Sequence, residues 1–230
     1  MNLQSLDLPR QSLIVDAALA LAGLSYGDPA SRGRYIANLY PYDDPAVADQ
    51  LASGQESCGL TCEAILRAVG VDGSIDWRRK EQGAHVEQRV DLLRVPYNQR
   101  WCTPPREGEY GLGAVSYQLE LARQHGALWA CPSTIEETLD LCEPGAMVQL
   151  EGPAHVLTVI GRLPDGSLET VEGGQVDGRN GGKCTAILQL RRELLLGAGG
   201  VRLRSGGSTG PGRRLVSILR AWELPLRVAA

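Results

Sequence analysis

Apolar residues recur at helical spacing in the N-terminal half of the chain. The stretch 13–24 is largely apolar and predicts a first helix that is buried. A loop rich in Gly, Pro, Asp and Tyr follows, and a short helix is predicted within it near 31–39. A further helix is predicted to start after Ser57, a favoured N-cap residue, and to end at Gly70, which can adopt the left-handed conformation. Residues 71–105 show no clear period and are expected to be irregular.

From Pro144 onward the period of the pattern changes to two. Alternation of apolar and polar residues is typical of strands with one buried face. The glycine-rich stretch 197–212 predicts a mobile hairpin loop. Helices followed by a mostly antiparallel sheet indicate an α+β fold with the N-terminal helices packed on the sheet. The predicted strands are 146–150, 155–161, 167–172, 185–192 and 214–224.

Size and charge narrow the classes of protein. A chain of 230 residues can form one domain that buries roughly 70% of its unfolded surface. The 23 Lys and Arg residues are scattered, and the 27 Asp and Glu residues bring the net charge to −4. This pattern lacks the basic surface that binds nucleic acid or an anionic membrane, so neither is expected as a partner.

The apolar stretch 13–24 could also be an export signal or an anchor. Asp16 interrupts it, the opposite charges of Asp7 and Arg10 cancel each other ahead of it, and the chain does not begin with a cluster of basic residues. A stretch of this length is too short to span a bilayer. We therefore expect a helix of the folded protein, with no membrane insertion and no recognisable signal peptide.

Six cysteines and three histidines are the residues that could bind metal or form disulfides. No cysteine pair has the two-residue gap of a zinc knuckle, and the histidines are far apart in sequence. At this length the fold needs no disulfides. We expect no metal and no cofactor, and we expect structural thiols around one reactive cysteine.

Cys58 is the candidate for that reactive cysteine. It stands just ahead of the predicted helix, and a helix N-terminus lowers the pKa of a thiol from its ordinary value near ~8.5. Nearly a hundred residues later His155 opens an apolar strand, and an imidazolium beside the thiol would lower the pKa further. Cys62 and Ile65 share the helix stripe of Cys58, so we expect Cys62 in the core and the stripe against the strand of His155. The competing interpretation is structural, because cysteine is among the most buried residue types.

A cysteine–histidine pair needs a third group to orient the imidazole. Glu172 shares a strand face with Leu168 and Thr170 and is the first candidate. Gln175 and Asp177 lie within a loop's reach of the same place, so they remain alternatives.

Four short segments together resemble a known family. They are 57–60 (SCGL) before a helix, 144–145 (PG) before a strand, 155–156 (HV) opening the next strand and 171–175 (VEGGQ) closing a third. In this order they are similar to the NlpC and CHAP branch of papain-like cysteine peptidases and amidases.

The resemblance covers roughly 55–192, so we expect one papain-like domain over 1–230 with elaborations on both sides of that core. The chain departs from the family at Ala146, where members often have aspartate, and at Ser57 and Gly59, which replace an acidic residue and a serine beside the cysteine. These departures indicate an outlying branch.

The resemblance implies a chemistry as well as a fold. Members mostly cut amide bonds in the peptide stems and cross-links of bacterial peptidoglycan, and they need no cofactor. Carried over to this chain, Cys58 is the nucleophile, His155 the general base and Glu172 the group that orients the imidazole. The backbone N–H of Cys58 would form part of an oxyanion hole. Further candidates for oxyanion or substrate contacts are Gln55, Ser57 and Gln175.

The leading functional prediction is therefore an amidase or endopeptidase acting on peptidoglycan. As an antibacterial or phage-related effector it would be made in a bacterial cytoplasm and delivered to the periplasm of a target cell, with an immunity or delivery protein as a partner. The alternative is a papain-like toxin that deamidates, cross-links or cleaves a protein. A third hypothesis is a catalytically silent adaptor in a phage tail or secretion assembly, against which the retained Cys58 and His155 count.

Overall fold

The computed structural model describes residues 4–41, 44–53, 57–81, 84–91, 93, 121–127, 129–151 and 155–227. The helices of the N-terminal part are α1 (Gln4–Leu21), α2 (Arg32–Leu39), α3 (Pro45–Ala52) and α4 (Cys58–Ala68). A hairpin of β1 (Ser74–Glu81) and β2 (Ala84–Asp91) follows them. The short strand β3 (Trp129–Ala130) and helix α6 (Ile135–Leu141) come next, ahead of the longer strands of the main sheet.

The main sheet is antiparallel and runs in the order β3-β9-β4-β5-β6-β7-β8. An additional pairing of β8 with β9 closes six of these strands into a barrel, and β3 extends the sheet beside β9. Its longer strands are β4 (Ala146–Leu150), β5 (His155–Arg162), β6 (Leu168–Gln175), β7 (Ala186–Gly197), β8 (Gly200–Ser205) and β9 (Arg213–Arg220).

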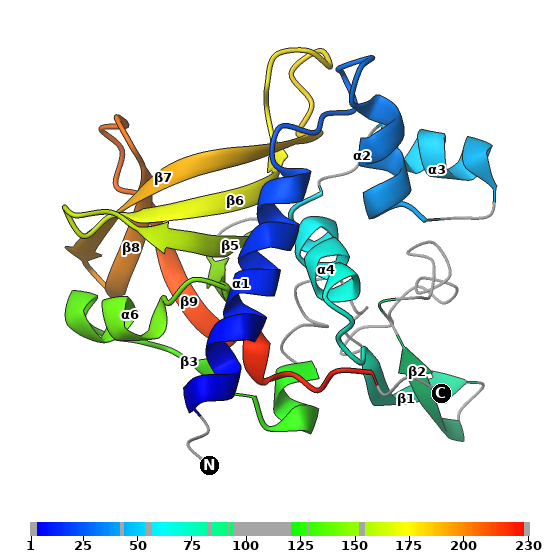
Figure 1. Ribbon diagram of the computed structural model, residues 1–230, viewed down its shortest axis with the longest axis horizontal. Coiled ribbons are helices and arrows are strands. Elements are labelled where there is room, and N and C mark those ends of the chain that lie inside the picture. Colours follow the sequence, from blue (N-terminus) through cyan, green and yellow to red (C-terminus); the bar gives the residue numbers. More distant parts are fainter. Residues whose placement is uncertain are drawn as a thin grey trace.

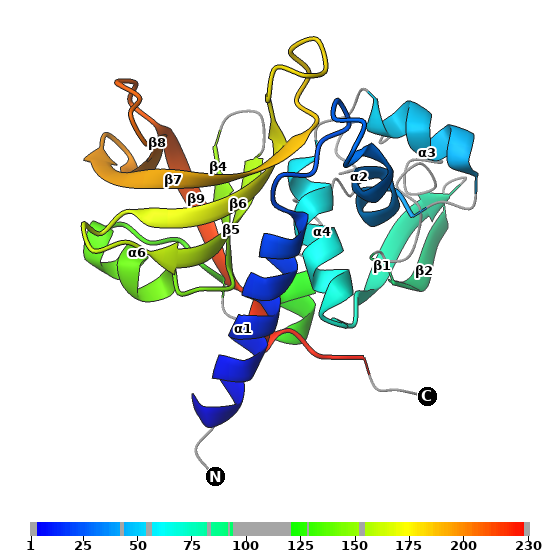
Figure 2. The same ribbon diagram turned by 45° about the horizontal axis from the view of Figure 1, so that its top comes forward.

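Helices α1 and α4 pack side by side on the barrel, where α4 contacts β5 and β6. In Figures 1 and 2 these two helices stand between the barrel and the group formed by α2, α3 and the β1–β2 hairpin. The prediction of an α+β fold with antiparallel strands is confirmed. The closure of the sheet into a barrel was not predicted.

The closing strand β8 lies inside the stretch 197–212, so the prediction of a mobile loop there is wrong. Val201 and Leu203 are buried and alternate with arginines, as in a strand with one buried face. The glycines that suggested a loop are the turns on either side of this strand, with positive φ at Gly199 and Gly207.

The prediction that 71–105 is irregular is also wrong within the described residues. The hairpin pairs Ser74 with Asp91 and continues without a shift to Glu81 and Ala84. The sequence of β2 does alternate between apolar and polar residues, whereas the charged run 78–81 ends the alternation in β1, so only part of the strand signal was present.

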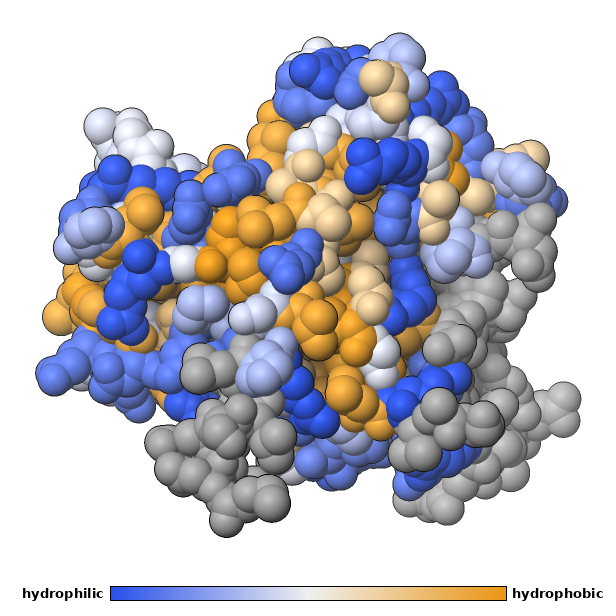
Figure 3. Space-filling model, in the orientation of Figure 1, coloured by the Kyte–Doolittle hydropathy of each residue, from blue (hydrophilic) through white to orange (hydrophobic). Residues whose placement is uncertain are grey.

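Helix α1 is buried on one face only, whereas the sequence predicted a buried helix over 13–24. Ile14 and Ala18 are buried, but Leu13 is 52% exposed and Leu19 is 42% exposed. This helix crosses the centre of the face drawn in Figure 1, and apolar surface occupies the centre of the same face in Figure 3. No helix in the described part of the chain is long and apolar enough to span a membrane.

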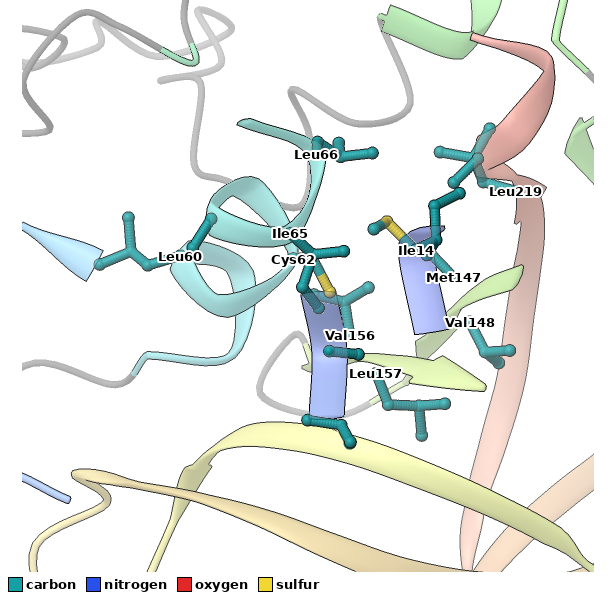
Figure 4. Close-up of a cluster of buried hydrophobic side chains, with 14 of the residues drawn as sticks. Ile14, Leu60, Cys62, Ile65, Leu66, Met147, Val148, Val156, Leu157 and Leu219 are labelled. Atoms are coloured by element: carbon teal, nitrogen blue, oxygen red, sulfur yellow. The ribbon is translucent and has the colours of Figure 1, made fainter. Parts of the chain in front are cut away.

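The core forms where α1 and α4 meet the barrel. Cys62 and Ile65 of α4 lie in one buried cluster with Val156 of β5 (Figure 4). The sulfur of Cys62 lies 3.5 Å from the hydroxyl oxygen of Thr158 in the same strand. The prediction that the apolar stripe of α4 packs against the strand of His155 is therefore confirmed.

A bulge in β6 brings this strand against the start of α4. Gly173 and Gly174 together face the single residue Ile187 of β7. The N–H of Gly174 donates to the hydroxyl of Ser57 over 2.8 Å. Ser57 makes no side-chain hydrogen bond to its own helix, so the expectation that its side chain caps α4 is wrong. Its hydroxyl instead ties α4 to β6.

Close packing at this junction requires glycine at position 173. A Cβ atom there would lie 2.0 Å from Oγ1 of Thr61 and 2.5 Å from the carbonyl oxygen of Ser57. Gly173→Ala should therefore displace the start of α4 and lower the free energy of unfolding by about 1–3 kcal/mol, measured by chemical denaturation. Gly161→Ala in β5 is the control, because a Cβ there would meet its nearest neighbour at 3.4 Å. Equal losses in the two variants would contradict this account.

Candidate active site

Two element starts meet at the candidate site. Cys58 is the first residue of α4 and is 7% exposed, so its sulfur lies at the positive end of the helix dipole. His155 is the first residue of β5 and is 6% exposed. The packing of α4 on β5 brings these residues together, and their side chains share a hydrogen bond.

Glu172 reaches the same place from the neighbouring strand β6. Val159 pairs with Thr170, so strand alternation puts His155 and Glu172 on one face of the sheet. The opposite face contacts α4, so this face is turned into the barrel. Nε2 of His155 lies 2.8 Å from Oε2 of Glu172, whose side chain is fully buried. The structure thus brings the three predicted catalytic residues into one hydrogen-bonded chain.

The ionisation of Glu172 fixes the tautomer of His155. Burial alone would raise the pKa of this carboxyl, but Arg192 and His155 together lower it to about 2. An ionised carboxylate only accepts hydrogen bonds, so Nε2 of His155 must carry a hydrogen and donate it. Nδ1 is then the ring nitrogen that faces Cys58.

The electrostatics of the pair favour a charged state. Burial would raise the pKa of Cys58, but the hydrogen bond and charge of His155, with the N–H groups of Val156 and Gly59, bring it below its ordinary value. Burial would lower the pKa of His155, yet Cys58 and Glu172 raise it to about 9. Both shifts favour the thiolate–imidazolium form of the pair over the neutral form.

Arg192 of β7 is a member of this site that the sequence analysis missed. Its Nε donates to Oε1 of Glu172 over 2.6 Å, and a terminal nitrogen donates to Oε2. The other terminal nitrogen donates to the hydroxyl of Ser205 in β8. Thr170 also donates to Oε1 of Glu172, over 2.7 Å. The carboxylate is therefore held on both of its oxygens.

A sequence signal for Arg192 existed. It pairs with Leu168 and shares its strand face with Leu188 and Leu190, so a charge stands in a row of apolar positions. A charged side chain in such a row is buried only when it is paired. The partner could not be named from the sequence, because the strand register decides which carboxylate it meets.

The remaining predicted site residues have other roles or cannot be placed. Gln55 lies outside the described residues. Ser57 is fully buried, and its hydroxyl is engaged by the N–H of Gly174. Its carbonyl oxygen accepts a hydrogen bond from the hydroxyl of Thr61 over 2.8 Å. Ser57 thus anchors the start of α4.

The two alternatives for the third residue are occupied elsewhere. The amide of Gln175 donates to the carbonyl of Gly173 over 3.2 Å and to Oε2 of Glu172 over 3.4 Å, so it supports Glu172. Asp177 accepts the N–H of Arg179 over 2.9 Å within its own loop. The structure joins neither of them to the imidazole by a hydrogen bond.

Cys62 differs from Cys58 in its surroundings. It is 1% exposed, and burial raises the pKa of its thiol to about 12. Cys102 lies outside the described residues, and none of the five cysteines within them forms a disulfide. In the same part of the chain, no three His, Cys, Asp or Glu side chains are grouped as metal ligands.

Replacement of Glu172 tests the hydrogen-bonded chain without any substrate. Glu172→Gln removes the charge that supports the imidazolium, so alkylation of Cys58 by iodoacetamide at pH 6 should slow by about tenfold, as expected for a pKa change of one unit. His155→Ala should slow it further. Site-resolved mass spectrometry after timed exposure measures the rate at Cys58 alone. Glu169→Gln, the same substitution on the opposite face of β6, is the control and should change the rate by less than about twofold; an unchanged rate in Glu172→Gln would place the orienting group elsewhere.

Comparisons of the chain with models of protein families, with curated proteins and with solved structures found no match. A function must therefore be inferred from the geometry of this site and from the sequence pattern around it.

Proposed function

We propose that the protein is a cysteine-nucleophile hydrolase that cuts amide bonds. The observation that carries this proposal is the buried chain from the thiol of Cys58 through His155 to Glu172, with the thiol at a helix start. A structural cysteine needs neither a lowered pKa nor an imidazole fixed by a carboxylate. A nucleophile needs both.

Each group has a role in such a reaction. The thiolate of Cys58 attacks the carbonyl carbon, and Nδ1 of His155 protonates the leaving amine. Water then hydrolyses the thioester, with His155 as the base. The N–H of Cys58 is a donor for the oxyanion. A Cβ atom on Gly174 would lie 3.3 Å from this nitrogen, so glycine leaves room beside it.

The proposed fold is papain-like and the proposed substrate is the peptide stem of bacterial peptidoglycan. The order of the elements supports the fold, because α4 with Cys58 precedes and packs on the strands of His155 and Glu172. The substrate is supported by the resemblance of the site segments to the NlpC and CHAP branch. An antibacterial role would require delivery to the periplasm of a target cell and an immunity protein in the producer.

Removal of each thiol in turn tests the nucleophile. Cys58→Ala should abolish the release of stem peptides from purified peptidoglycan, measured by mass spectrometry of the soluble fragments. Cys62→Ala should keep most of the activity and lower the free energy of unfolding by about 1–2 kcal/mol, as a small core truncation does. An inactive Cys62 variant beside an active Cys58 variant would overturn the assignment. If wild type leaves several wall types intact, the substrate class is wrong and protein substrates become the next to assay.

The raised pKa of His155 predicts that hydrolysis and alkylation of Cys58 depend differently on pH. Hydrolysis needs the imidazolium as the acid for the leaving amine, so kcat/KM should fall as the pH rises through about 9. Alkylation of Cys58 needs only the thiolate, so its rate should not fall over the same range. Parallel measurements on wild-type protein check this separation. A joint decline of both rates would indicate unfolding or a different acid.

A further inference from the structure

One buried charge in the site has no part in the proposed reaction. The side chain of Arg192 is 9% exposed and lies inside the barrel. Its guanidinium binds Glu172 through two nitrogens and Ser205 through the third. A paired donor of this kind fixes the plane of a carboxylate as well as its charge.

The two oxygens of Glu172 have different partners. Oε1 accepts from Nε of Arg192 and from Thr170, each within 2.7 Å. Oε2 accepts from a terminal nitrogen of Arg192 and from Nε2 of His155. The fork of Arg192 therefore sets the rotation of the carboxylate, and this rotation aims Oε2 at the imidazole.

Arg192 also compensates for the burial of Glu172. Burial raises the pKa of the carboxyl, and the hydrogen bonds from Arg192 are foremost among the effects that lower it. Without Arg192 the imidazolium of His155 would be the one cation beside the carboxylate among the residues that the structure describes. Among the described residues, the charged and titratable groups that interact with Glu172 are His155 of β5 and Arg192 of β7, with a weaker electrostatic effect between Glu172 and the thiol of Cys62 in α4.

We propose that Arg192 is a positioning residue that acts through Glu172. Its fork keeps the carboxylate ionised and aimed at Nε2 of His155, and this preserves the thiolate–imidazolium pair under acidic conditions. The catalytic meaning of this role rests on the proposed function. The reactivity of the thiol itself does not, because it can be measured without a substrate.

The test is the pH dependence of Cys58 alkylation by iodoacetamide between pH 4.5 and 8.5, followed by site-resolved mass spectrometry. Arg192→Met should slow alkylation about tenfold at pH 4.5, where Glu172 would take up a proton, and less than about twofold at pH 8. Arg192→Lys keeps the charge and should recover most of the rate at pH 4.5. Arg191→Met is the matched control, since Arg191 lies on the opposite, exposed face of β7; it should leave the profile unchanged.

Loss of Arg192 leaves a buried carboxylate with one cation fewer, which can unfold the protein. The double variant Glu172→Gln/Arg192→Met removes both charges and should unfold at a higher denaturant concentration than Arg192→Met. Its alkylation profile should match that of Glu172→Gln, because Arg192 acts only through the carboxylate. Additional slowing in the double variant would overturn the proposal.

Two other results would also overturn it. The first is uniform slowing at every pH in Arg192→Met with no recovery in Arg192→Lys, as expected of a purely structural residue. The second is a wild-type profile in Arg192→Met. If the profiles change as expected but no substrate is cleaved, the role of Arg192 stands and the proposed function fails. If amide hydrolysis is established and the profiles do not change, the function stands and this inference fails.

Discussion

A carboxylate inside a β-barrel stays ionised only if cations and hydrogen-bond donors replace the water it has lost, and the site depends on this requirement at Glu172. Two cationic side chains satisfy this requirement. They are Arg192 of β7 and His155 of β5, and these strands flank β6, which carries Glu172. These hydrogen bonds require β5, β6 and β7 to keep their register, because a slip of one residue would turn a charged side chain to the other face of the sheet. The same balance of charge orients the imidazole that faces Cys58.

The second constraint is the docking of the helical part on the barrel. The bulge at Gly173 and Gly174 lets α4 approach β6, and it also releases the backbone of Ile187 from its pairing with that strand. Ile187 pairs instead with the segment after α1. The N–H of Gly23 donates to its carbonyl over 2.8 Å, and its own N–H donates to the carbonyl of Leu24 over 2.9 Å. One irregularity thus fixes the ends of two helices on the barrel.

The sequence carried the local features of this structure better than the pairwise ones. The start of α4, its end before Gly70 and the first residue of β5 follow from periodicity and from the residue types that favour helix ends, so Cys58 and His155 could be placed from the chain alone, although the side chain of Ser57 does not cap the helix. Alternation along β6 also put Glu172 on the correct face. Barrel closure and the role of Arg192 depend on which strands pair and in which register. These contacts join distant residues, and no local pattern in the chain specifies them.

The distance along the sequence between Cys58 and the residues that lower its pKa has a further consequence. The groups that lower the pKa of Cys58 include His155 and Val156, which lie nearly a hundred residues away and reach it only in the folded protein. In an unfolded chain Cys58 is an ordinary thiol, largely protonated at neutral pH and no more reactive than the other five cysteines. A newly made, unfolded chain therefore has no cysteine that differs from the others in reactivity. Folding is itself the step that gives this thiol its lowered pKa, once the barrel and α4 have come together.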